Sequence, residues 1–152
     1  MLVIGIGNMF RHDDGAGPSA ASLVKAGAPP GVKVLIRSGD AADLMEVWAK
    51  EEYVFVIDAM KAGLTPGEFK RIDGRTPTFP VKDFQFSTHS MGLAEAIEIG
   101  RVLVRLPKNL IIYGIEVSDV GNGQGLTPVV EKAVSEVAAR IIEEIKAIQA
   151  KQ

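Results

Sequence analysis

Two hydrophobic patterns alternate along the chain. Short unbroken apolar runs predict strands buried on both faces, and apolar residues spaced by three and four predict helices with one apolar face. The runs at residues 2–6, 53–57 and 109–115 are therefore expected strands, and residues 32–36 alternate enough to form another strand. The helical spacing covers residues 18–25, the segment that follows Asp40, residues 93–104 and residues 128–148.

Two segments show a different pattern. Residues 67–72 alternate apolar and charged side chains, which predicts a shorter, half-exposed edge strand. Residues 75–86 contain two prolines and no clean period, so we expect irregular surface structure there. Asp40 and Thr127 stand where helix N-caps are expected, and Pro128 suits a first helical position.

Strands and helices thus follow one another in a repeating order. This order predicts a three-layer α/β/α sandwich around a mostly parallel five-stranded sheet with one antiparallel edge strand. The 152 residues contain no internal repeat, low-complexity segment or linker. Residues 1–152 are therefore expected to form a single domain.

Composition narrows the class of protein further. The hydrophobic fraction of 47% and the charged fraction of 24% are ordinary for a soluble globular protein, and the net charge of −2 disfavours nucleic-acid binding. No apolar stretch approaches the roughly 18 residues of a membrane span, and the first run is too short for a signal peptide, so we expect a cytoplasmic protein. The absence of cysteine excludes disulfides and thiolate chemistry.

Three ionisable residues stand next to expected strands or helices. Asp14 comes after the first strand, Asp58 directly follows the third, and His89 precedes a helix. Ligands bind at the carboxyl ends of strands in such sheets, where these side chains can meet. Two carboxylates and one imidazole form an open oxygen and nitrogen site, which suits Ni²⁺, Zn²⁺, Mn²⁺ or Fe²⁺.

Structural interpretations compete with this site. Asp13 is best explained as a helix cap, and Asp14 could be one as well. His89 stands among hydroxyl residues that also suit a capping cluster, and His12 is expected to be a solvated surface group. Glu116 ends a strand, so it either lines the same edge of the sheet or bonds local backbone.

The turn at Gly5-Ile6-Gly7 is weak evidence for nucleotide binding. It lacks the third glycine of the dinucleotide fingerprint, and no acidic residue ends the second strand. Ser87 or Ser90 beside His89 would allow a serine hydrolase, but adjacent residues rarely align as nucleophile and base, and no nucleophile-elbow motif is present. A nucleotide-binding domain and a serine hydrolase are therefore both disfavoured.

An ordered set of short motifs nevertheless resembles one known family. From residue 2 to about residue 140 the chain is similar to the hydrogenase maturation endopeptidases. The motifs that carry the resemblance are Gly5-Ile6-Gly7-Asn8, Asp13-Asp14-Gly15-Ala16-Gly17, Val56-Ile57-Asp58-Ala59, Ser87-Thr88-His89-Ser90-Met91-Gly92-Leu93, Gly114-Ile115-Glu116 and Gly125-Leu126-Thr127-Pro128-Val129. None of them is specific alone, whereas their order is.

The resemblance implies a site and an activity. It implies that Asp14, Asp58 and His89 bind metal and carry catalysis. A carboxylate that the metal does not fully occupy can serve as general base, and our hypothesis is that one of the two aspartates does so. Family members remove a short C-terminal peptide from the precursor of a nickel–iron hydrogenase large subunit after nickel loading. The nickel comes with the substrate and serves as the recognition signal, and another divalent ion is an expected occupant of the isolated protein. The expected partners are that precursor and other hydrogenase maturation proteins, and the expected state is a monomer.

Two departures from the family pattern concern the metal arm and the partner. The position of Asp14 is often glutamate in the family, so the metal-binding side chain here is shorter by about one methylene. Arg37-Ser38-Gly39-Asp40 replaces the aspartate-glycine-glycine-threonine stretch associated with substrate choice, which leaves the partner hydrogenase open. A non-catalytic chaperone that inspects the nickel site of the precursor would need the same three residues and remains the alternative function.

Overall fold

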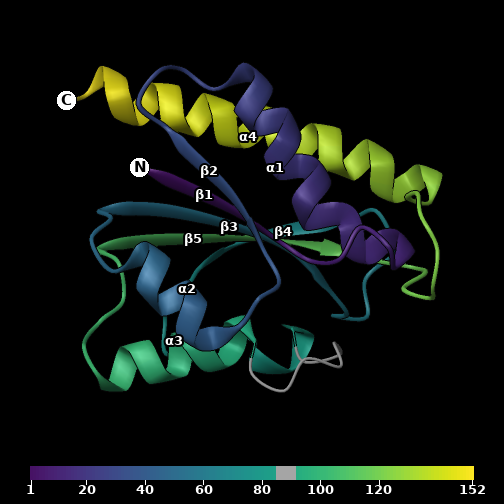
Figure 1. The fold of residues 1–152 in the computed structure, drawn as a ribbon, viewed down its shortest axis with the longest axis horizontal. Coiled ribbons are helices and arrows are strands. Elements are labelled where there is room, and N and C mark those ends of the chain that lie inside the picture. Colours follow the sequence, from purple (N-terminus) through teal and green to yellow (C-terminus); the bar gives the residue numbers. More distant parts are fainter. Residues whose placement is uncertain (85–91) are drawn as a thin grey trace.

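The computed structural model describes residues 1–84 and 92–152, and these form a five-stranded sheet with the order β2-β1-β3-β5-β4 (Figure 1). Its neighbouring strands are parallel except for β4, which runs antiparallel to β5 at one edge. The strands are β1 (Leu2–Ile6), β2 (Lys33–Arg37), β3 (Tyr53–Met60), β4 (Phe69–Asp73) and β5 (Asn109–Glu116). The predicted sheet with one antiparallel edge strand is therefore confirmed.

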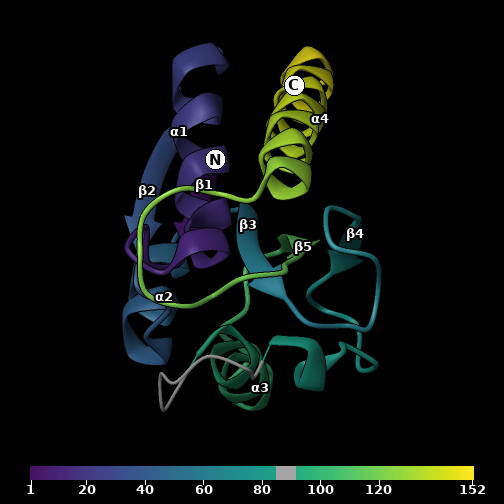
Figure 2. The ribbon, with the colours of Figure 1, turned by 90° about the vertical axis from the view of Figure 1, so that its right-hand side faces the viewer.

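Helices cover both faces of this sheet. Figures 1 and 2 show α1 and α4 on one face and α2 and α3 on the other. The helices are α1 (Ala16–Gly27), α2 (Ala41–Trp48), α3 (Leu93–Val102) and α4 (Pro128–Ala150). Since successive strand residues point to opposite faces, Phe55 packs in the core under α1 and α4, whereas Val56 packs in the core under α2 and α3. The predicted three-layer sandwich is confirmed.

The third strand is longer than its apolar run predicts. β3 continues through Asp58 to Met60, and Asp58 lies opposite Gly114 in the parallel register with β5. A Cβ added to Gly114 would lie 2.6 Å from the sulfur of Met60 and 2.9 Å from a ring carbon of Phe84. The absence of a side chain at this position therefore leaves room for Met60 and Phe84 beside the strand.

The segment from 75 to 84 is not wholly irregular surface, as its proline content suggests. Phe79 and Phe84 are buried, and their rings stack with centroids 5.4 Å apart. Both belong to the core under α2 and α3, and Phe84 ends a short 3₁₀ helix (Val81–Phe84). The prediction is wrong for these two residues because two isolated aromatic anchors leave no period in the sequence.

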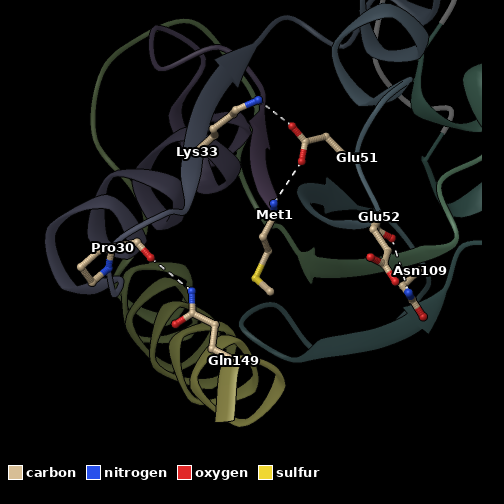
Figure 3. A network of polar contacts seen from close by, with 7 residues as sticks. All are labelled: Met1, Pro30, Lys33, Glu51, Glu52, Asn109 and Gln149. Carbon is tan, nitrogen blue, oxygen red and sulfur yellow. Dashed lines mark hydrogen bonds and ion pairs between the residues drawn. The ribbon is translucent and has the colours of Figure 1, made fainter. Parts of the chain in front are cut away.

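Polar contacts connect segments at the amino ends of the strands (Figure 3). The carboxylate of Glu51 accepts a hydrogen bond from the amino group of Met1 at 3.0 Å and one from Lys33 Nζ at 2.8 Å. Gln149 of α4 donates to the carbonyl of Pro30 at 3.2 Å. This edge is opposite the carboxyl ends where Asp14 and Asp58 lie.

Among the described residues, no helix has the length and apolarity to cross a bilayer.

The end of α3 contains a strained residue. Val104 was expected on the buried face of this helix, but it lies beyond the helix end and is 91% exposed. Its φ of +54° is the left-handed conformation that usually requires glycine, and Arg105 N donates to Gly100 O at 2.7 Å, as at glycine-terminated helices. The prediction for Val104 is wrong because it follows the helix rather than extending it.

We expect Val104→Gly to raise the free energy of unfolding by about 1 kcal/mol, because it relieves this strain and removes almost no packing. Urea denaturation measures the change. Val102→Gly is the matched control: Val102 is 80% exposed but still helical, so its replacement should lower stability by roughly 0.5 kcal/mol. Equal losses for both variants would contradict the assignment of strain.

Candidate functional site

Asp14 lies at the start of α1, beside the carboxyl end of β1. It belongs to a 3₁₀ helix (His12–Gly15) that leads directly into α1, and its side chain is almost fully buried. The backbone N–H of Asn8 donates to Asp14 Oδ2 at 2.9 Å. The loop after β1 therefore holds this carboxylate in one orientation.

Glycines allow α1 to begin so close to the sheet. A Cβ on Gly17 would overlap the carbonyl oxygen of Ile6, and a Cβ on Gly7 would overlap the carbonyl oxygen of Asp14. Gly7 also has a φ of +146°, and its N–H donates to Arg37 O at 3.1 Å. The glycine turn after the first strand therefore serves close packing of the Asp14 segment.

We expect Gly7→Ala to lower the free energy of unfolding by about 2 kcal/mol or more, because the new methyl group must displace the backbone of Asp14. Thermal and urea denaturation measure this loss. Gly31→Ala is the control, since Gly31 also has a positive φ, +88°, but no atom lies within 4 Å of its added Cβ. It should lose only about 1 kcal/mol, from backbone strain alone. If the two variants lost the same amount, overlap at Asp14 would not be the cause.

Asp58 lies near the end of β3 on the face covered by α2 and α3. Its side chain is partly exposed, whereas neighbouring strand residues are buried. The N-terminus of α3 lies on this face at the same end of the sheet (Figure 1). His89, the third predicted residue, precedes this helix in sequence but lies outside the described residues.

The negative charge of Asp14 acts on the carboxyl group of Asp58. Burial raises the pKa of Asp58 well above its usual value, the negative charge of Asp14 raises it further, and a hydrogen bond from the Ala59 backbone opposes both effects. A carboxylate whose charge is disfavoured by burial and by a neighbouring negative charge creates a local demand for a cation. In the described part of the chain no three His, Cys, Asp or Glu side chains gather to hold a metal ion.

Asp13 has a role that the sequence did not indicate. Its carboxylate is fully buried and accepts hydrogen bonds from the backbone N–H groups of Ser118 and Asp119, both at 3.0 Å. The N–H of Thr127 donates at 2.7 Å and the Thr127 hydroxyl at 3.0 Å. Asp13 therefore fastens the loop between β5 and α4 onto the segment that carries Asp14.

This arrangement overturns the prediction for Asp13, which is not a helix cap. Thr127 is the N-cap residue of α4 and Pro128 follows it at the start of the helix, as predicted, but the Thr127 hydroxyl donates to Asp13 and makes no capping bond. Burial raises the pKa of Asp13, but the hydrogen bonds from Asp119, Thr127 and Ser118 outweigh burial and leave this pKa below its usual value. No local signal could reveal this contact, because the partners stand more than 100 positions away along the chain.

Two further ionisable residues also bind backbone. The ring Nδ1 of His12 lies 3.2 Å from Gly125 O, and its backbone N–H donates to Gly123 O at 2.9 Å, so His12 is not simply solvated. Glu116 is 4% exposed and accepts hydrogen bonds from the N–H groups of Ala62 and Leu64. Of the two interpretations of Glu116, bonding to backbone is therefore the one observed.

Comparisons with known proteins agree on one family. Residues 20–144 match the family model described as hydrogenase maturation protease. The chain is 32% identical over 148 residues to the hydrogenase 3 maturation protease of Escherichia coli strain K12. The aligned region covers 92% of this chain and 87% of that relative.

Solved structures show the same fold. A hydrogenase maturating endopeptidase from Escherichia coli superimposes with a TM-score of 0.79 at 22% identity, over 96% of this chain and 91% of the other. The solution structure of a second endopeptidase from Escherichia coli gives a TM-score of 0.73 at 27% identity, over 95% of this chain and 90% of the other.

Proposed function

Because the chain belongs to the hydrogenase maturation protease family, we propose that it removes a C-terminal peptide from the nickel-loaded precursor of a nickel–iron hydrogenase large subunit. Its general activity is that of a protease in hydrogenase maturation. The nickel-dependent cleavage is the proposal. The observation that supports it most is that Asp14 and Asp58 stand at the carboxyl ends of the neighbouring parallel strands β1 and β3, where the negative charge of Asp14 raises the pKa of Asp58.

The carboxylates of Asp14 and Asp58 suit a nickel ion that the substrate brings with it. Oxygen ligands with an added imidazole suit a divalent first-row ion, and we assign the imidazole to His89. The Asn8 N–H orients the Asp14 carboxylate, and the backbone of Asp58 belongs to β3, so both residues stand on ordered elements of the fold. Coordination of the precursor's nickel would hold the scissile peptide beside the two aspartates.

The chemistry then requires a base and an activated water. A nickel ion bound there would supply a Lewis acid that polarises a carbonyl or lowers the pKa of water. One of the two aspartates accepts the proton of the attacking water. Hydrogen bonds from Asn8 and Ala59 keep the two carboxyl groups oriented while this occurs.

The test is cleavage of defined precursors. The chain is incubated with the precursor of each nickel–iron hydrogenase large subunit of the host organism, prepared with and without nickel. Intact-mass spectrometry should show loss of a C-terminal peptide only from the nickel-loaded form. Stable complex formation without any mass loss would overturn the proposal and favour the chaperone, and equal cleavage of both forms would exclude nickel as the recognition signal.

A further inference from the structure

An exposed apolar groove lies beside the candidate site. Met9, Phe10 and Ile36 are 52%, 65% and 47% exposed, although each is a large apolar side chain. Together they line a hollow of about 310 Å³, whose remaining walls are Gly7, Asn8, Arg37 and Ser38. Large apolar side chains that gather in one hollow indicate a binding surface more strongly than isolated ones do.

The groove is continuous with the segment that holds Asp14. Its wall includes Asn8, whose backbone N–H donates to Asp14 Oδ2 at 2.9 Å. Its wall also includes Gly7, whose N–H donates to Arg37 O at 3.1 Å and joins the loop to β2. A chain lying in the groove would therefore pass directly beside the Asp14 carboxylate.

One side of the groove is the edge of the sheet. Among the described residues β2 pairs with β1 alone, so its other side is a free edge (Figure 2). Lys33 donates to Met1 O and Arg37 accepts from Gly7, which directs the backbone groups of residues 33, 35 and 37 toward β1. In a parallel strand the alternate residues, Val34 and Ile36, then direct their N–H and C=O groups outward.

A free strand edge beside an apolar hollow favours one kind of occupant. Outward N–H and C=O groups bind an extended polypeptide through its backbone, and the hollow accepts one of its apolar side chains. We propose that an extended segment of the precursor next to its cleavage site adds to the free edge of β2 and buries an apolar side chain between Met9, Phe10 and Ile36. This inference rests on the proposed function, since the groove wall includes Asn8, whose N–H binds the Asp14 carboxylate.

Charged substitutions in the groove test the proposal. Phe10→Asp and Ile36→Asp should each raise KM for the nickel-loaded precursor at least about tenfold while kcat stays within about twofold, because docking is lost and the aspartate pair is untouched. Phe10→Leu should retain most of the affinity. Val102→Asp is the matched control, since Val102 is also apolar and 80% exposed but lies at the C-terminus of α3.

A binding measurement separates this inference from the proposed function. The dissociation constant for the precursor is measured by fluorescence anisotropy for every variant, whether or not cleavage occurs, and circular dichroism verifies folding. Weaker binding by both groove variants alone supports the inference even if the wild type does not cut. Unchanged KM and unchanged binding for both, or equal losses for Val102→Asp, would overturn it while leaving cleavage intact. A groove that only joins two copies of this chain, seen by sedimentation, would also overturn it.

Discussion

Asp58→Asn is expected to reduce kcat/KM for cleavage of the nickel-loaded precursor by about 10³-fold or more, because it removes one of the two carboxylates to which we assign nickel binding and the role of general base. Asparagine keeps the size of the side chain, so the effect reports charge and basicity. Cleavage is followed by the mass loss of the precursor at several substrate concentrations. Asp14→Asn is expected to behave in the same way.

The same substitution should not weaken the fold. Burial and the Asp14 charge raise the pKa of Asp58 above its unfolded value, so the folded, metal-free protein holds the proton more tightly than the unfolded chain. Stability from this group is full below the unfolded pKa and is lost as the pH rises through the folded pKa. At neutral pH, metal-free Asp58→Asn should therefore be at least as stable as the wild type.

The control for this experiment is Asp73→Asn. Asp73 ends β4, and its carboxylate accepts a local hydrogen bond from Arg75 N at 2.9 Å, away from the Asp14 and Asp58 pair. Its replacement should change kcat/KM by less than about threefold. Full cleavage by Asp58→Asn, or an equal loss in Asp73→Asn, would refute the role of the aspartate pair.

Asp13→Asn is expected to lower the free energy of unfolding by about 3 kcal/mol, the largest stability loss that we predict for a single isosteric change. Asparagine has the shape of aspartate but places an NH₂ group against backbone N–H donors of Ser118, Asp119 or Thr127. Urea denaturation measures this loss. Asp40→Asn is the same chemical change at an exposed helix cap that accepts from Asp43 N, where asparagine serves equally well, so it should cost less than about 0.5 kcal/mol.

The effect of Asp13→Asn should depend on pH. Because hydrogen bonds lower the pKa of folded Asp13 below its unfolded value, its contribution to stability is present above the unfolded pKa and is lost as the pH falls through the folded pKa. The difference between wild type and variant should therefore stay constant from neutral pH down to about pH 5 and shrink below about pH 4. A difference that grew on acidification would contradict ionised Asp13 as the binding partner of the loop.

Local sequence patterns were sufficient to predict most of the helices and strands. Unbroken apolar runs predicted β1, β3 and β5, alternation predicted β2 and β4, and a three-and-four spacing predicted the buried stripe of α4 from Val130 to Ile145. These patterns work because each element must bury one face or both, and that requirement is written within a few consecutive residues. The carboxyl-edge rule also selected Asp14 and Asp58, and the structure places them at the carboxyl ends of β1 and β3.

The sequence by itself thus determined the layers and the strand pattern, because burial and backbone pairing impose short periods on the chain. Only the tertiary structure decided where β3 ends and what Asp13, His12 and Glu116 bind, since the partners of these three residues are backbone groups that folding brings together from distant segments. Backbone N–H groups are identical at every residue except proline, so no side-chain pattern marks which of them a buried carboxylate will meet.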